Sequence, residues 1–171
     1  MKKKKFLWAK NSLTNHGSKA HFQKVQGHIN EKLLVVYAFY ELEIFLSMME
    51  DIVKVRLDNQ NLETIKKNIL AVISLENESK EDIEEKLKNK YSSIIEKLDN
   101  LYKTHLKVLN KSEKIKLFSQ ILNNLKLPDL LKAKERLKKT ITDSTDKNET
   151  SRMISEYNLL IDEINFIKKK S

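Results

Sequence analysis

The stretch LLVVYAFYELEIFLSMMEDIVKVRL, from Leu33 to Leu57, decides the fold of this chain. It is apolar almost all round, although Glu41 and Glu43 sit in its middle. A helix that is apolar on every face has to be surrounded by protein, because any bare side would expose apolar surface to water. We therefore expect a central helix over 33–57, capped at Asn30 and ended by the polar run 58–61.

The rest of the composition favours an all-α fold. The 171 residues include only two Gly and one Pro, and sheet proteins need far more residues of this kind for their tight turns. The length suits one domain with its own core. The sequence thus predicts a single-domain bundle of about five to seven helices around 33–57. Residues 1–18 are expected to form a flexible basic arm, and 19–171 the helical-bundle domain.

The remaining helices follow from hydrophobic spacing and cap residues. We expect helices over 19–28, 62–75, 79–110, 112–127 and 151–169, one more starting at Pro128–Asp129, and a loop over 142–150. Ser79 and Asp82 resemble a capping box. Apolar residues at alternating spacings of four and three predict coiled-coil-like seams over 83–109 and 153–167.

The sequence also excludes several classes of protein. It has no Cys, so a disulfide scaffold, a thiolate zinc site and a cysteine nucleophile are ruled out. The apolar patch Phe6–Ala9 is shorter than the roughly 7–15 residues of a secretory signal. The two glutamates argue against a membrane span in 33–49. We expect a cytoplasmic protein that does not cross a membrane.

Charge is unevenly distributed along the chain. The formal net charge is +7 over 1–28, −5 over 29–102, +8 over 103–139 and −1 over 140–171. If the two basic segments meet, they form a patch that attracts phosphate backbones or acidic partners. The alternative is that these lysines are ordinary solvated residues on exposed helix faces.

No known catalytic or metal-binding motif occurs. The chain lacks HExxH, Glu-x-x-His, a phosphate loop and GxSxG, so we expect no metal site and no cofactor, and we assign no catalytic residue. Two polar residues are expected inside the bundle. His105 falls on a seam, where we expect a hydrogen-bonded core histidine. Glu41 needs a Lys or Arg partner, and a structural ion pair is the expected solution.

Two segments carry a resemblance to a known family. Val35–Leu75, with Val36-Tyr37-Ala38-Phe39-Tyr40-Glu41 as an aromatic–Glu signature, and Phe118–Pro128 resemble the RiboL-PSP-like branch of the HEPN superfamily. The resemblance implies a compact helical bundle that often dimerises and, in many members, a metal-independent ribonuclease of a defence or toxin–antitoxin system. The family's Arg-x4–6-His motif would fall at Arg136–Ile141, where Ile141 replaces the histidine. The resemblance therefore implies a degenerate member without that proton-transfer route.

Three hypotheses follow. The first is a degenerate HEPN-like protein that binds RNA or an acidic partner protein in a prokaryotic defence or mobile-element setting, with a homodimer expected. Its contacts would come from Lys2, Lys3, Lys4, Lys5, Trp8, Lys132, Lys134, Arg136, Lys138 and Lys139, and Trp8 would stack on a base. The second is a helical interaction or assembly module that uses the seams 83–109 and 153–167 and binds no nucleic acid. The third is an active ribonuclease that uses His16, His21 or His28.

Overall fold

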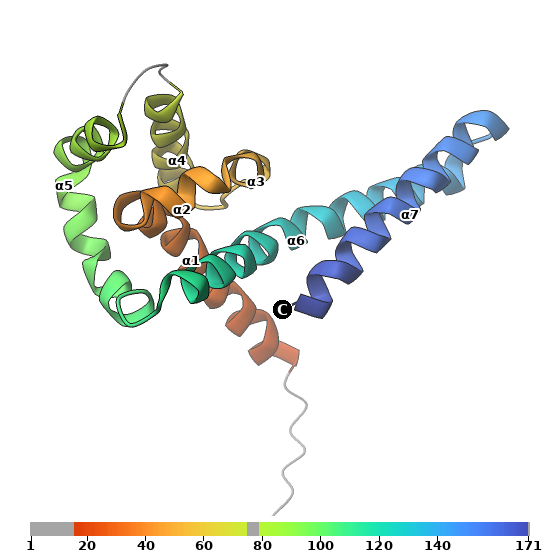
Figure 1. Ribbon diagram of the computed structural model, residues 1–171. Helices are drawn as coiled ribbons and strands as arrows, with labels where there is room; N and C mark the ends of the chain where they lie inside the picture. Colours follow the sequence, from red (N-terminus) through yellow and green to blue (C-terminus); the bar gives the residue numbers. More distant parts are fainter. Residues whose placement is uncertain (1–15, 75–78, 171) are drawn as a thin grey trace, which may run out of the picture.

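The computed structural model describes the backbone of residues 16–74 and 79–170, and side chains within 27–74 and 79–169. These residues form seven helices and no strand, so the all-α prediction is confirmed (Figure 1). The helices are α1 (His16–Tyr40), α2 (Leu42–Ser47), α3 (Met49–Lys54), α4 (Gln60–Ile73), α5 (Lys80–His105), α6 (Lys111–Asp143) and α7 (Lys147–Lys170).

The stretch Leu33–Leu57 is central, but it is not one helix. All seven residues from Leu33 to Phe39 are buried, as an all-round apolar segment requires. The predicted continuous helix is nevertheless wrong. The backbone leaves helical geometry at Glu41 (φ −134°, ψ 48°) and again at Met48 (φ −119°, ψ 22°). These breaks divide the stretch into the end of α1, α2 and α3, and each of the three segments buries apolar residues.

The start of this region also differs from the prediction. α1 runs without interruption from His16, so the separate helix over 19–28 and the cap at Asn30 are both wrong. Residues 16–18 of the predicted flexible arm belong to α1, and residues 1–15 lie outside the described part of the chain. The cap in this region is Asn59, whose side chain accepts hydrogen bonds from the backbone N–H groups of Asn61 and Leu62 at the start of α4.

Capping boxes open the two long helices that follow. The predicted pair Ser79 and Asp82 is confirmed, because each side chain bonds the other residue's backbone at the start of α5. α5 kinks at Tyr91 and ends at His105, earlier than expected. Asn110 and Glu113 form a second box at the start of α6, which begins at Lys111, one residue before the expected helix over 112–127.

Pro128 does not end a helix, which corrects another prediction. It lies inside α6, which spans 33 residues, and the expected loop over 142–150 shrinks to 144–146. A proline inside a helix loses one backbone hydrogen bond and costs roughly 3 kcal/mol. α7 packs antiparallel on α6, and this packing is the tertiary contribution that offsets the cost (Figure 1).

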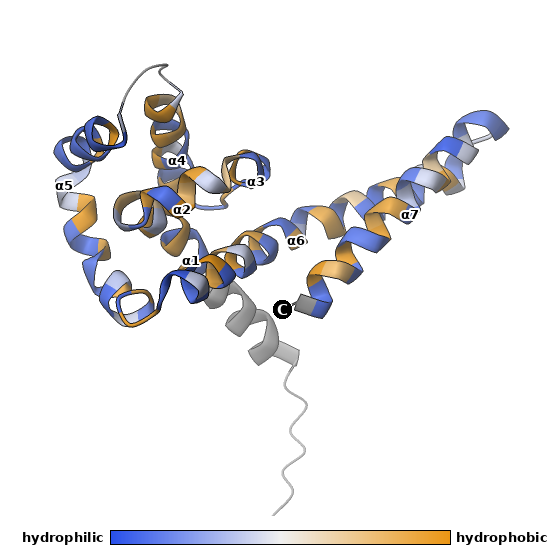
Figure 2. Cartoon of the chain, viewed as in Figure 1, coloured by the Kyte–Doolittle hydropathy of each residue, from blue (hydrophilic) through white to orange (hydrophobic). Residues whose placement is uncertain are grey.

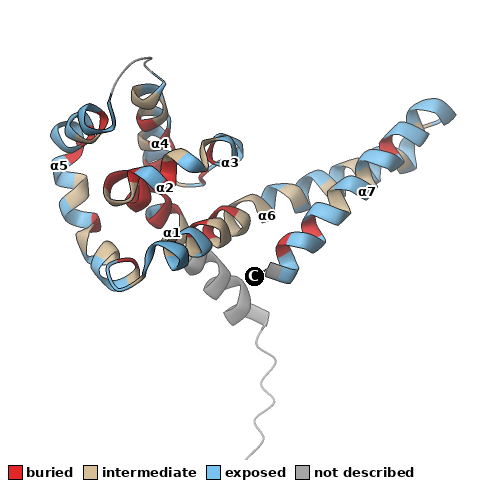
Figure 3. Ribbon diagram, in the orientation of Figure 1, coloured by how far each residue is buried: buried red, intermediate tan, exposed pale blue. Residues whose placement is uncertain are grey.

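The helices divide into two structural parts, which we call the body and the hairpin. The body is residues 16–127, and it holds the whole main hydrophobic cluster, whose last member along the chain is Leu125. The hairpin is residues 128–170, the distal part of α6 with α7, and it projects from the body (Figure 1). Figure 3 shows the buried residues gathered in the body, with only a few on α7.

Candidate functional site

The basic segment 103–139 folds against the acidic middle of the chain. Three lysines of α6 form ion pairs with carboxylates of the segment 41–51: Lys111 with Glu43, Lys114 with Glu41, and Lys126 with Asp51. Charges that are separate in the sequence are therefore complementary within the fold. These pairs connect α6 to the segment 41–51 and leave less free basic surface than the sequence suggests.

Glu41 has the partner that its position requires. Its side chain and that of Lys114 are 17% and 15% exposed, so Glu41 is only partly buried. The adjacent Tyr37 donates a hydrogen bond from its hydroxyl to the carbonyl oxygen of Lys114 at 2.7 Å, and its ring stacks on Phe118. Burial, and secondarily the Glu41 charge, raise the pKa of the Tyr37 phenol, which stays neutral. Glu41 thus has a structural role at the α1–α6 contact.

Three buried charged groups were missed in the sequence: Glu31, Lys66 and Glu63. Glu31 is 4% exposed and accepts hydrogen bonds from the backbone N–H groups of Asp58 and Asn59. Lys66, which is 3% exposed, donates to the carbonyl oxygen of Val55 and lies 3.0 Å from Glu63. Glu63 accepts a hydrogen bond from Leu57 N at 2.9 Å, so all three anchor the segment between α3 and α4. Their only sequence signal is that each lies among apolar residues on a helix.

The other residues singled out from the sequence are His105 and those of the N-terminal segment. His105 is half-buried at the last residue of α5, not in the middle of a helical seam. Lys2, Lys3, Lys4, Lys5 and Trp8 lie outside the described residues, as do the side chains of His16 and His21.

A pocket of about 400 Å³ lies where the hairpin leaves the body. It is lined by Gly27, His28, Glu31, Arg56, Asp58, Asn124, Leu125, Pro128 and Asp129. His28 Nδ1 lies 3.3 Å from Glu31 Oε2, and both oxygens of Glu31 are already engaged. Three carboxylates face one guanidinium, so the formal charge of the lining is −2 with His28 neutral, which disfavours a phosphate ligand. Among the described residues, no group of three His, Cys, Asp or Glu side chains could hold a metal ion.

The hairpin is an antiparallel pair of helices joined by a regular seam. Along α7 the predicted seam residues pack toward α6: Met153, Ile164 and Ile167 are buried, and Tyr157 and Leu160 are half-buried. The facing residues of α6 are all half-buried: Leu130, Lys134, Leu137 and Ile141. Both sets follow the four–three spacing of a coiled coil. The α7 seam is therefore occupied within the chain, and so is the α5 seam, whose Leu87 and Leu98 are in the main cluster.

The residues beside the seam give the hairpin two chemically different sides. On α6, Leu131 and Lys138 come directly after the seam residues Leu130 and Leu137. On α7, Ile154, Ile161 and Lys168 come directly after the seam residues Met153, Leu160 and Ile167. Because the two helices are antiparallel, these two sets lie on the same side of the hairpin. One side, the lysine–isoleucine face, thus consists of Leu131, Lys138, Lys147, Ile154, Ile161 and Lys168. The other, the glutamate face, consists of Glu149, Glu156 and Glu163 with Ala133 and Thr140. Leu159, between two of these glutamates, borders the glutamate face.

Both faces carry exposed apolar side chains. Leu131, Ile154 and Leu159 are 36%, 45% and 72% exposed. Figure 2 shows apolar positions along both helices, whereas the far end of the hairpin is hydrophilic. None of the six ionised side chains of the two faces forms an ion pair with another described residue. The hairpin thus presents apolar surface together with uncompensated charge.

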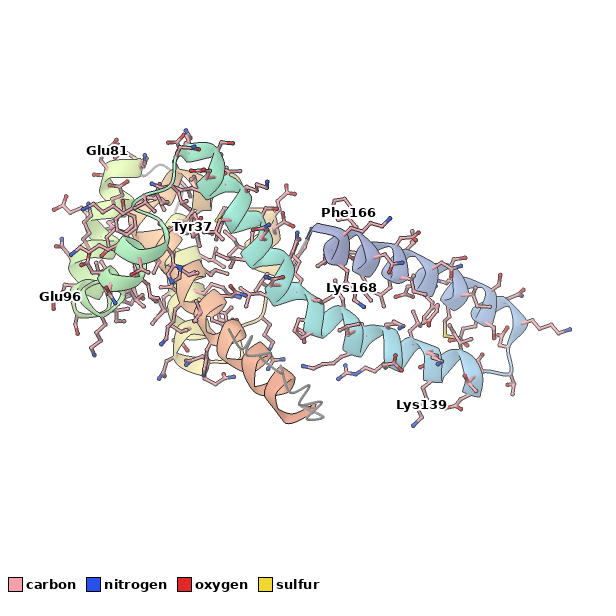
Figure 4. The ribbon with its side chains drawn as sticks, turned by 90° about the horizontal axis from the view of Figure 1, so that it is seen from below. Tyr37, Glu81, Glu96, Lys139, Phe166 and Lys168 are labelled. Atoms are coloured by element: carbon pink, nitrogen blue, oxygen red, sulfur yellow. The ribbon has the colours of Figure 1, made fainter. Side chains whose placement is uncertain are left out.

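The predicted contact residues of α6 are divided among different surfaces. Lys132, Arg136 and Lys139 project away from the seam and form an exposed ridge, and Figure 4 shows Lys139 pointing away from α7. Lys134 lies in the seam beside Glu135, and Lys138 belongs to the lysine–isoleucine face. Lys132 is paired with Asp129. Ile141, at the position where the family motif has its histidine, is half-buried in the seam.

Comparison with known proteins finds no relative: no family model, curated protein or solved structure matches the chain. The HEPN resemblance therefore stays a prediction. Within the described ranges, no helix combines the length and the apolar character that crossing a membrane requires.

Proposed function

We propose that this chain is a protein-interaction module that binds its partner through the α6–α7 hairpin. The observation that carries this proposal is the position of Leu131, Ile154 and Leu159. These apolar side chains are exposed on a projecting element, although the chain has a well-packed core in which to bury such residues. Exposed apolar surface next to polar residues is typical of protein-binding sites.

The division between body and hairpin supports the same function. The main cluster includes no residue of the hairpin, so the hairpin adds nothing to that cluster. A two-helix hairpin buries only one stripe of each helix, and its other sides stay available to a partner. The second hypothesis from the sequence placed the partner on the seams 83–109 and 153–167. Those seams are occupied within the chain, so the surface proposed here is the sides of the hairpin beside the α7 seam.

Photo-crosslinking in cells tests the proposal. A crosslinking amino acid at Leu131 or Ile154 is expected to form adducts with a specific protein. The matched control is Val53, an aliphatic residue of α3 in the body that is 63% exposed. Adducts from Val53 equal to those from the hairpin positions, or no adduct from either hairpin position, would overturn the proposal.

A second candidate function is RNA binding along the ridge of α6, in keeping with the HEPN resemblance. The observation that favours it is the alignment of Lys132, Arg136 and Lys139 on one exposed line, where they could contact successive phosphates. The competing observation is that Asp129 pairs with Lys132 at one end of this line.

Binding of a single-stranded RNA, measured by fluorescence anisotropy at increasing salt, tests this second function. We expect affinity to fall steeply with salt and to drop in R136A/K139A, because each lost cation removes a phosphate contact. The matched control is K90A/K97A, which removes two exposed lysines of α5. Binding that is insensitive to salt, or equally weak in both variants, would rule this function out.

A further inference from the structure

We infer that the partner of the hairpin is a second copy of this chain, which places its glutamate face against the lysine–isoleucine face of the first copy. This inference rests on the proposed function and names the partner that the hairpin binds. It follows from the complementarity of two surfaces that are both present on one hairpin.

The lysine–isoleucine face has its charges at the ends and its apolar residues in the middle. On α7, Lys147, Ile154, Ile161 and Lys168 recur every seven residues, so they form one straight row. Leu131 and Lys138 of α6 lie beside this row. Glu135 is the one carboxylate at the border of this face, and it lies 3.7 Å from Lys134. The face therefore carries a positive charge at each end and an apolar centre.

The glutamate face has the opposite pattern of charge. Glu149, Glu156 and Glu163 also recur every seven residues, on the other side of the same helix. Leu159 provides an apolar contact between two of them and is 72% exposed. Arg152 and Arg136 border this face, and so do Asp129 and Asp143, so its net charge stays negative. The Ala133 and Thr140 side chains beside these glutamates are small, which allows close approach of another helix.

The two rows match in length and spacing because they share one helix. When the glutamate face of one copy meets the lysine–isoleucine face of another, carboxylates meet ammonium groups and Leu159 meets the isoleucines. If like faces met instead, lysines would meet lysines or glutamates would meet glutamates, which is unfavourable. The contact is therefore heterologous, and each copy keeps one face free for a further copy.

The size of the contact predicts its strength. The 24 residues of α7 span about 36 Å, and a helix is about 10 Å wide, so each copy buries on the order of 400 Å². The total of about 800 Å² lies below the range of stable interfaces. We therefore expect weak association that increases with protein concentration and weakens with salt.

Sedimentation velocity of the full chain and of charge-reversal variants tests the inference. Wild-type protein is expected to associate increasingly as its concentration rises. K138E/K147E/K168E reverses the lysine–isoleucine face, and E149K/E156K/E163K reverses the glutamate face. Each variant is expected to associate at least about tenfold more weakly, because like charges now meet. Mixing the two variants is expected to restore association, since the acidic lysine–isoleucine face of the first then meets the basic glutamate face of the second.

The matched control reverses charges that face directly away from the seam. K132E/K139E/K169E makes the same charge change outside both faces and is expected to leave association unchanged. All substituted residues are exposed, and circular dichroism checks that each variant keeps its helices.

Three results would overturn the inference: a monomer at every concentration, association that survives both reversals, or a mixture that stays monomeric. These results are independent of the crosslinking test. Adducts with a different protein from Leu131 or Ile154, together with a strictly monomeric chain, would leave the proposed function standing and remove the second copy as the partner.

Discussion

At the scale of single residues, the fold depends on a few buried charges that connect helices. Lys66 is the most buried of them, and it is bonded to the Val55 carbonyl and to Glu63. We expect Lys66→Met to lower the free energy of unfolding by about 3–5 kcal/mol, because it leaves the largely buried Glu63 carboxylate without its buried cation and the Val55 carbonyl without its donor. Chemical denaturation measures this change.

The control for this substitution is Lys67→Met. Lys67 is also near Glu63, at 3.6 Å, but its side chain is 71% exposed, so its loss should cost less than about 1 kcal/mol. Equal effects of the two substitutions would show that the burial of Lys66 has no special role.

The lowered pKa of the Glu63 carboxyl leads to an expected dependence of stability on pH. Burial raises the pKa of its carboxyl, but the hydrogen bond from Leu57 N and the Lys66 ammonium outweigh this effect, so the pKa lies below its ordinary value of 4.5. A lowered carboxyl pKa contributes stability above the unfolded pKa, and this contribution is lost as pH falls through the folded pKa. In Glu63→Gln, the free energy of unfolding should fall less steeply from pH 6 downward than it does in the wild-type protein. The same slope in both proteins would contradict this role of Glu63.

At the scale of elements, Pro128 is a local conflict inside a long helix. Pro128→Ala restores a backbone N–H within α6 and removes the clash of the proline ring with the preceding turn, so we expect it to stabilise the protein by up to about 3 kcal/mol. Thermal melting measures the shift. Ala133→Pro, at an exposed position one and a half turns later, should have the opposite sign. Destabilisation by Pro128→Ala would mean that α6 requires the proline.

Local signals in the sequence predicted part of the local structure, although the cap at Asn30 was wrong. The Ser79–Asp82 capping box and the α7 seam were visible because they depend on residues three and four apart. The breaks at Glu41 and Met48 and the continuity at Pro128 were not visible, because packing against other helices decides them. The two faces of the hairpin are regular in the sequence, but only the antiparallel pairing with α6 shows which residues share a side.

At the scale of the whole molecule, the hairpin should open without unfolding the body. Ile164 is 4% exposed in the seam, and Ile164→Asp buries a charge there. We expect circular dichroism to show the loss of hairpin helix, while methyl NMR signals of Leu34 and Leu122 in the body stay dispersed. The control is Leu159→Asp, at an exposed position. Collapse of the body signals in Ile164→Asp would contradict the division into body and hairpin.

Hydrogen exchange of the dilute wild-type chain tests whether the hairpin is a separate element, because it reports the stability of every helix separately. We expect amides of α7 and of α6 beyond Pro128 to exchange through a lower opening free energy than amides of Leu33–Phe39 in α1. Equal protection of these segments would contradict this expectation, because the hairpin would then be part of one core and not a separate binding element.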